Sequence, residues 1–294
     1  MLKRAHRFFY HIITQKMICG MRLIEQIKLL VFMITNKSTR MEISMAKVIA
    51  IVNSKGGVGK TTTTVSLASC ISSKGKKVLA IDADQQGNLT SGFGINKNRE
   101  YTLYEIMTEK CLIKDAVVSD AISGVDVIPS NVNLAAVQTD LAYLNDSQGV
   151  LSTKLDEIKE FYDYVFIDCG PSLETMTLNV FMAADSLIIP VQCEYYALEG
   201  LVQLLRIVKC IKNNWGKAVE IEGVLMTMAS GRSKMNSEVI REVRGNVHCR
   251  IFDTVIPRNV RLAEASSFGL PINFYDPRSA GARAYMELVE EIIS

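Results

Sequence analysis

A glycine-rich segment between a predicted strand and a predicted helix is the part of the chain best suited to chemistry. It reads Ser54-Lys55-Gly56-Gly57-Val58-Gly59-Lys60-Thr61-Thr62. Glycines let a backbone approach a ligand closely, and the N–H groups at a helix N-terminus attract anions. We expect Lys60 to reach the β- and γ-phosphates of a nucleotide and the Thr61 hydroxyl to ligate Mg²⁺. The segment therefore predicts a phosphate-binding loop.

The elements around this loop follow a regular alternation. Apolar runs predict strands at residues 48–52, 78–81, 125–128, 164–167, 187–191, 221–226 and 254–256. Helical patterns occupy residues 61–73, 151–161, 173–182, 197–211, 236–246 and 280–292. Buried strands that alternate with helices of this length are typical of a mostly parallel sheet with helices on both faces. We therefore expect an α/β fold of the P-loop NTPase class, with a mostly parallel twisted sheet.

Charge divides the chain into two parts. Residues 1–44 hold eight Lys+Arg and two Asp+Glu, whereas residues 45–294 hold 25 and 29, a net charge of −4. We expect residues 1–44 to be a basic N-terminal extension that is either not folded or not translated, with Met45 as the start. A basic interfacial helix or a targeting peptide is the alternative for this segment. The acidic body must bind nucleic acid, if it does so, through a local basic patch.

The cysteines and histidines point away from metal and redox chemistry. The seven cysteines form no Cys-x-x-Cys pair, and His248 is the only histidine after residue 44. We interpret the cysteines as small apolar side chains of a protein in a reducing cytoplasm. A zinc site lacks the ligand spacing that it would need.

Four segments together resemble a known family, the ParA/Soj/MinD-type ATPases. Residues 55–62 have the form of the deviant Walker A motif, and residues 82–88, Asp-Ala-Asp-Gln-Gln-Gly-Asn, resemble the family's switch I. Residues 166–172, Phe-Ile-Asp-Cys-Gly-Pro-Ser, resemble its Walker B and switch II. Residues 190–200 and 254–265 look like the chromosomal Soj/ParA branch. The resemblance covers residues 47–290 and does not reach residues 1–44.

The resemblance implies a single ATPase domain over residues 45–294 that hydrolyses ATP with Mg²⁺ and dimerises on ATP. It implies that Lys55 acts across the dimer on the other subunit's ATP, as an arginine finger does, and that Asp84 orients the attacking water. Asp168 ends a buried strand, where a carboxylate needs a charged partner such as water-held Mg²⁺. The predicted catalytic residues are Lys55, Lys60 and Asp84, and the predicted metal-site residues are Thr61, Asp82 and Asp168. The predicted nucleotide contacts are Lys55, Gly56, Gly57, Val58, Gly59, Lys60, Thr61 and Thr62, with Pro257 and Asn259 on the adenine side.

Two residues depart from the family pattern. Gln85 stands where many members have proline, so the fixed φ of proline is lost and switch I gains freedom. Gly170 also stands where many relatives have proline, and its backbone N–H could contact the γ-phosphate and sense hydrolysis.

A DNA surface is expected from basic residues near the C-terminus. The candidates are Arg232, Lys234, Arg241, Arg244, Arg258 and Arg261. No aromatic residue interleaves them and no helix-turn-helix pattern is evident, so contact with the DNA backbone, independent of sequence, is expected. A solvated helix face is the plain alternative. The resemblance implies a ParB-like, centromere-binding partner and a cytoplasmic, nucleoid-associated ATPase that segregates chromosome or plasmid DNA.

Two other branches of the family provide alternatives. A MinD-like membrane or protein-positioning ATPase ends in a basic amphipathic helix, but residues 286–294 are acidic, and anionic lipid would repel them. No stable membrane association is therefore expected. The nitrogenase iron-protein branch supplies cluster cysteines, but Cys169 and Cys193 do not lie in that branch's context.

Overall fold

The computed structural model describes residues 45–122, 124–142, 147–172, 175–194, 197–230 and 234–294. The chain divides into two units, Met1–Ser44 and Met45–Ser294, and all described residues belong to the second. The prediction of a separate N-terminal extension therefore falls outside the described residues.

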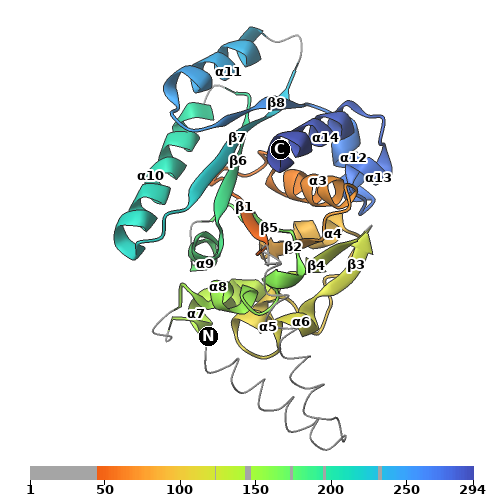
Figure 1. The fold of residues 1–294 in the computed structure, drawn as a ribbon, viewed down its shortest axis with the longest axis vertical. Coiled ribbons are helices and arrows are strands. Elements are labelled where there is room, and N and C mark those ends of the chain that lie inside the picture. Colours follow the sequence, from red (N-terminus) through yellow and green to blue (C-terminus); the bar gives the residue numbers. More distant parts are fainter. Residues whose placement is uncertain (1–44, 123, 143–146, 173–174, 195–196, 231–233) are drawn as a thin grey trace, which may run out of the picture. The chain divides into compact units, whose positions relative to one another are not determined.

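An eight-stranded sheet forms the centre of this unit (Figure 1). Its strands are β1 (Lys47–Ile51), β2 (Val78–Ala83), β3 (Val118–Ile122), β4 (Val125–Ile128), β5 (Tyr164–Cys169), β6 (Ser186–Gln192), β7 (Glu220–Ala229) and β8 (Ile251–Pro257). Their order across the sheet is β3-β4-β2-β5-β1-β6-β7-β8, and every neighbouring pair except β3–β4 is parallel. The predicted fold class, a mostly parallel sheet of the P-loop type, is confirmed.

The strand side chains alternate between two apolar cores, one on each face of the sheet. On β1, Val48 and Ala50 belong to one core, whereas Ile49 and Ile51 belong to the other. Because the side-chain period of a strand is two, a strand buried on both faces reads as an unbroken apolar run. This explains why the sequence marks β1 so clearly.

Helices cover both faces of the sheet (Figure 1). One core takes residues from α3 (Lys60–Ser72), α4 (Asn88–Gly92), α12 (Val260–Ser267), α13 (Ile272–Tyr275) and α14 (Ala280–Ile293). The other takes residues from α5 (Leu103–Met107), α6 (Ile113–Ala116), α7 (Val137–Asp140), α8 (Val150–Leu155), α9 (Thr175–Ala183), α10 (Ala197–Trp215) and α11 (Lys234–Asn246). The 3₁₀ turns η2 (Val132–Ala136) and η3 (Lys159–Phe161) lie between these helices in sequence.

Several elements differ from the sequence prediction, which does not include the helices α4, α5, α6, α7, α12 and α13. Strand β3 was not predicted, because it carries exposed Ser119 and Asp120 and has no apolar run. The predicted helix over residues 151–161 is a short helix, α8, followed by the turn η3.

The outer edges of the sheet are irregular or covered. At β8, the Glu291 carboxylate of α14 accepts hydrogen bonds from the backbone N–H groups of Asp253 (3.0 Å) and Thr254 (2.8 Å). At β3, Asp120 adopts φ +47°, and its N–H donates to Asp126 Oδ1 at 2.9 Å. Two backbone N–H groups of β8 thus have a side-chain partner, and strand β3 is irregular at Asp120.

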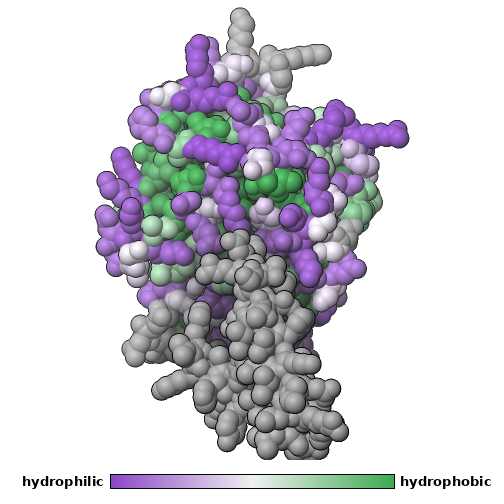
Figure 2. All heavy atoms as spheres, in the orientation of Figure 1, coloured by the Kyte–Doolittle hydropathy of each residue, from purple (hydrophilic) through white to green (hydrophobic). Residues whose placement is uncertain are grey.

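In the part of the chain that the structure describes, no helix is long and apolar enough to cross a membrane. Hydrophilic side chains cover much of the face in Figure 2, with hydrophobic side chains gathered between them. Among the described cysteines, Cys70, Cys169 and Cys193 are buried, and Cys210 of α10 is exposed.

Candidate nucleotide-binding site

The glycine-rich loop leaves the C-terminal end of β1 and leads directly into α3. Gly57 and Gly59 have φ values of +74° and +94°, which L-amino acids with side chains rarely adopt. A Cβ added at Gly56, Gly57 or Gly59 would meet no atom within 4 Å. The loop therefore faces open space across which its backbone can approach a ligand.

Hydrogen bonds hold the base of this loop to neighbouring strands. Asn53 Nδ2 donates to the Pro190 carbonyl of β6 at 2.7 Å, and Asn53 Oδ1 accepts from the Lys55 N–H at 2.9 Å. From β7, the Thr227 hydroxyl donates to the Val58 carbonyl at 2.9 Å. Three strands thus fix the loop, which lowers the entropy that a bound ligand would otherwise have to remove.

Lys60 is the first residue of α3, and it is 7% exposed. Its Nζ donates to the Lys55 carbonyl at 3.0 Å, which bends the side chain back over the loop. Burial lowers the pKa of Lys60, and the nearby Asp168 carboxylate opposes this effect. A buried ammonium group above an open loop is placed to bind phosphate oxygens.

Asp168 lies on β5 and accepts hydrogen bonds from two hydroxyls of α3. Thr61 Oγ1 donates to Oδ2 at 2.7 Å, and Thr64 Oγ1 lies 3.2 Å from Oδ1. The carboxyl group is fully buried, and burial, together with the neighbouring Asp82, raises its pKa to about 8. A cation bound beside this carboxylate would therefore compensate for the hydration that the carboxylate loses on burial.

Asp82 lies beside Asp168, because the two are register partners on β2 and β5. Its Oδ2 accepts hydrogen bonds from the Thr90 N–H (2.8 Å) and the Thr90 hydroxyl (2.7 Å), and its Oδ1 accepts from the Asp84 N–H (3.2 Å). Burial raises the pKa of Asp82 to about 6, although the Thr90 hydrogen bonds oppose the shift. The Thr90 hydroxyl also accepts from the Ser130 N–H at 2.9 Å, so one threonine joins three segments.

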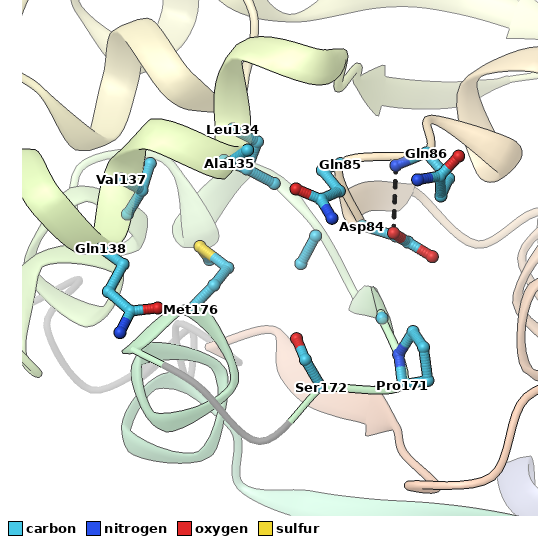
Figure 3. A pocket seen from close by; sticks show the side chains of 12 residues that line it. Asp84, Gln85, Gln86, Leu134, Ala135, Val137, Gln138, Pro171, Ser172 and Met176 are labelled. Carbon is cyan, nitrogen blue, oxygen red and sulfur yellow. Dashed lines mark hydrogen bonds between the residues drawn. The ribbon is translucent and has the colours of Figure 1, made fainter.

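Asp84 lies at the exposed side of the same site, next to a small cavity. The cavity has a volume of about 160 Å³ and lies between the loop after β2, the loop after β5 and the segment of η2 and α7 (Figure 3). Asp84 Oδ1 accepts from the Gln86 N–H at 3.0 Å, and a Cβ at Gly170 would lie 3.4 Å from the Asp84 side chain. Gln85 is exposed and lines the cavity, so both departures from the family pattern meet here.

Lys55 turns toward its own chain. Its Nζ forms an ion pair with Glu194 Oε1, just after β6, and both side chains are partly exposed. The ammonium group is therefore held within one subunit here. The predicted action across a dimer requires this ion pair to open.

The predicted adenine-side residues lie at the end of β8. Pro257 is the last residue of β8, and Asn259 is the N-cap of α12, where its Oδ1 accepts from the Arg261 N–H at 2.8 Å. The Arg258 N–H donates to the Ala229 carbonyl at 2.9 Å and joins this loop to the end of β7. Asn259 thus has a structural hydrogen bond in addition to its predicted contact.

The predicted DNA-binding residues are spread over two elements. Arg232 lies outside the described residues, and the side chain of Lys234, the first residue of α11, is likewise not described. Arg241 and Arg244 are exposed on α11, and Arg244 forms an ion pair with Asp253 at 3.5 Å. Arg258 is exposed at the β8–α12 loop.

Arg261 forms ion pairs with Glu264 at 2.8 Å and with Asp276 at 3.5 Å. Its hydrogen bond to Glu264 raises the pKa of the guanidinium. Because Arg244 of α11 and Arg261 of α12 are paired with carboxylates, these two helices carry less unpaired positive charge than the sequence implies.

Three contacts of the site were not predicted from sequence. Thr64 follows Thr61 by three residues on a helix, so its position on the same face could have been found. Thr90 and Glu194 gave no such signal. Asp82, the partner of Thr90, lies eight residues earlier across a turn, and Lys55, the partner of Glu194, follows the end of a different strand.

The residues present fit ATP and Mg²⁺. Lys60 and the loop N–H groups could hold phosphates, and Thr61 could ligate Mg²⁺ with Asp82 and Asp168 behind it. Val58 is buried and Thr62 is half-buried, so the loop ends are anchored in the fold. No group of three or more His, Cys, Asp or Glu residues that could hold a metal by themselves exists among the described residues. The site thus suits a metal that is ligated mainly by phosphate, hydroxyl and water.

Comparisons with known proteins agree with this geometry. A family model described as an AAA domain matches residues 46–221. The chain is 46% identical over 249 residues to the sporulation initiation inhibitor protein Soj of Bacillus subtilis, a match that covers 84% of this chain and 98% of Soj. It is 42% identical over 251 residues to the chromosome partitioning protein ParA of Caulobacter vibrioides, covering 84% of this chain and 94% of ParA.

A solved structure is similar in fold. Cobyrinic acid a,c-diamide synthase from Mycobacterium smegmatis, with a bound ATP analogue and magnesium, has a TM-score of 0.76 at 29% identity, covering 83% of this chain and 93% of that one. The synthase shows that this fold also occurs in a protein with a different name and role. The identity to Soj and ParA extends over most of the chain, and the chain therefore belongs to the Soj/ParA family of chromosome-partitioning P-loop ATPases.

Proposed function

We propose that the chain hydrolyses ATP with Mg²⁺, dimerises on ATP, binds DNA without regard to sequence and segregates chromosome or plasmid DNA. The proposed partner is a ParB-like centromere-binding protein that stimulates hydrolysis, and the proposed location is the cytoplasm, in association with the nucleoid. The observation that carries the proposal is the open glycine loop with Lys60 above it and the Asp168–Thr61–Thr64 arrangement beside it. The relatives named Soj and ParA support the partition role.

Each predicted site residue has a part in this proposal. Lys60 binds the negative charge of the β- and γ-phosphates. Thr61, Asp82 and Asp168 would hold Mg²⁺, Thr61 through its hydroxyl oxygen and the two carboxylates through water, and the metal would supply positive charge beside the phosphates. Asp84, which is partly exposed beside the cavity, orients the attacking water.

Lys55 supplies the second cation. In the proposed dimer its ammonium leaves Glu194 and reaches the other subunit's nucleotide, where it stabilises charge in the transition state. This step joins hydrolysis to dimerisation, because the nucleotide receives this second cation only when two subunits meet.

DNA binding is the part of the proposal with the largest physical obstacle. Residues 45–294 carry a net charge of −4, so a single subunit repels DNA at long range. Arg232, Lys234, Arg241, Arg244, Arg258 and Arg261 are the candidates for the contact. Dimerisation on ATP doubles any basic surface and increases the number of phosphate contacts, on which affinity depends steeply.

Filter binding on several unrelated duplexes, with ATP, ADP or no nucleotide and at several salt concentrations, tests this function. We expect binding only with ATP, at equal strength on all duplexes, and with a steep dependence on salt. Equal binding with ADP, or preference for one duplex, contradicts the proposal. Absence of binding in every state favours the alternative, a MinD-like membrane or protein-positioning ATPase.

A further inference from the structure

Helix α10 (Ala197–Trp215) carries three cations, Arg206, Lys209 and Lys212, against one acidic residue, Glu199. From residue 200 to residue 217 the sequence holds Arg206, Lys209, Lys212 and Lys217 and no Asp or Glu. The first three are exposed and follow one another at intervals of three residues on α10. Residues three apart are neighbours on a helix surface, so these cations form one row, which we call the α10 row.

The cations of the α10 row are free of competing carboxylates. None of the three forms an ion pair with any carboxylate that the structure describes. The row runs for about 9 Å along the helix, at 1.5 Å per residue. Duplex DNA carries about one phosphate charge per 1.7 Å of its axis, so a row of this length can contact several phosphates at once.

Helix α11, one of the two regions in which the sequence predicts the DNA contact, is different. It carries Glu238 and Glu242 between its cations, and Arg244 is already paired with Asp253. Breaking such a pair reduces the gain from a new phosphate contact. The two helices contact each other, and the α10 row has more unpaired charge than α11.

The buried face of α10 argues against a lipid surface as the ligand. Leu201, Leu204 and Ile211 are between 0% and 4% exposed, so the apolar side of the helix is already packed in the protein core. A helix that lies in a membrane interface needs this apolar face free to enter the lipid. A polyanion that requires only surface cations, such as the DNA backbone, fits the exposed side.

We infer that the α10 row, Arg206, Lys209 and Lys212, is a principal DNA-backbone contact of this protein. The inference rests on the proposed DNA-binding function and adds the α10 row to the residues predicted on α11 and near α12. The contact is made through phosphates, so it carries no sequence preference. The same row ends at Trp215, three residues beyond Lys212, which is 43% exposed and is the single tryptophan of the chain.

Charge reversal in the full-length protein tests the inference. Lys209→Glu with Lys212→Glu is compared with Lys76→Glu plus Lys114→Glu, which changes the net charge equally at two exposed lysines away from α10. With ATP and at about 0.1 M salt, we expect the α10 pair to weaken filter binding at least about tenfold. The slope of log affinity against log salt should fall by about two. The control pair should bind like the wild type, and ATP hydrolysis without DNA should be the same in all three proteins.

Two further measurements separate a lost contact from lost structure. The neutral variant Lys209→Gln with Lys212→Gln should show an intermediate loss, and its thermal unfolding should match that of the wild type. In the wild-type protein with ATP, added duplex should reduce acrylamide quenching of Trp215 fluorescence. ADP should abolish this protection, because the proposed dimer is then absent.

The outcomes distinguish the inference from the function on which it rests. If the α10 variants bind DNA as tightly as the control pair, and duplex leaves Trp215 quenching in the wild type unchanged, the inference is overturned and the proposed function stands. A wild-type protein that binds no duplex in any nucleotide state overturns both. Binding to anionic phosphatidylglycerol vesicles in place of DNA, lost in the α10 variants, also overturns the inference and assigns the row to a membrane surface.

Discussion

The buried floor of the candidate site and its exposed rim are built in different ways. In the floor, Lys60, Asp82 and Asp168 are at most 7% exposed, and each has a hydrogen-bond partner from another residue of the chain. In the rim, Lys55 is exposed and Asp84 is half-buried beside a cavity. The groups expected to bind nucleotide are therefore fixed by folding, whereas those expected to hydrolyse it have room to move.

This difference has a physical reason. Buried charges must be paired and hydrogen-bonded, so the floor is specified by the same contacts that stabilise the fold. Groups in the rim are solvated and can change partners at low cost. In the proposed function hydrolysis depends on a second subunit, so the rim of a single chain lacks one of the groups that hydrolysis needs. The predictions below test whether the floor and the rim separate binding from hydrolysis.

Removing the floor cation should have the largest effect on ATP binding, and with it on every later step. Lys60→Ala is expected to weaken ATP binding by about 100-fold or more, because charge-assisted contacts to phosphate contribute about 3 kcal/mol. Titration of a fluorescent ATP analogue measures the affinity, with Lys76→Ala as the control for loss of a surface lysine. Near-normal affinity in the Lys60 variant would remove the basis for the phosphate site.

Removing the rim carboxylate should separate hydrolysis from binding. Asp84→Ala is expected to bind ATP with an affinity within about twofold of the wild type while its kcat falls by about 10²–10⁴-fold, the usual contribution of a positioned acid or base. Size-exclusion chromatography with saturating ATP should show a dimer. If this variant remains monomeric, or if Gln86→Ala loses as much activity, Asp84 does not orient the water.

A second floor residue, Thr90, should affect stability and metal dependence together. Thr90→Val keeps the shape but removes the hydroxyl that donates to Asp82 and accepts from Ser130, at a cost of about 1–3 kcal/mol in the free energy of unfolding. The Mg²⁺ concentration needed for tight ATP-analogue binding should rise. Urea unfolding and a Mg²⁺ titration are the measurements. Thr90→Ser, which retains the hydroxyl, should recover the Mg²⁺ response, and a valine variant equal to the wild type in both would rule out this role.

The ion pair in the rim should have a smaller effect. Glu194→Gln is expected to change the free energy of unfolding by less than about 1 kcal/mol, because the pair is partly exposed. It should lower the protein concentration at which ATP-dependent dimers form, by up to about fivefold, since Lys55 no longer has to leave a carboxylate. Analytical ultracentrifugation with ATP measures this shift. The same substitution combined with Lys55→Ala should show no gain; a gain there would mean that Glu194 acts independently of Lys55.

Removing residues 1–44 should change neither part of the site. A chain that begins at Met45 contains the entire described unit, in which both apolar cores and every candidate site residue lie. We expect ATP affinity and hydrolysis within about twofold of the full chain. Liposome binding that disappears with the removed segment would instead support an interfacial role for it.

The floor of the site and the centre of the sheet could be predicted from sequence because both depend on burial. Strands such as β1 and β5 are apolar on both faces; the glycine loop follows the end of β1, and Asp168 is the next-to-last residue of β5. Strand β3 could not be predicted in this way, because its exposed residues leave no apolar run.

Contacts between residues far apart in the sequence could not be predicted either. The pairing of Arg244 with Asp253 and of Lys55 with Glu194 depends on how separate elements meet. Charge counted along the sequence therefore placed the DNA contact on α11 and on the segment with Arg258 and Arg261, without the carboxylates that pair with Arg244 and Arg261 there. The α10 row becomes visible only when exposure and ion pairs are known for each cation.

The covered edge of β8 limits how copies of this protein can assemble. An exposed strand edge can recruit a strand from another chain, which leads to aggregation or to open-ended fibres. Glu291 occupies the N–H groups of Asp253 and Thr254, and the left-handed Asp120 interrupts the opposite edge. Growth of the sheet from one molecule to the next would first have to break these bonds. Under the proposed function, copies of the protein held close together on DNA would therefore not be joined through the β8 edge of their sheets.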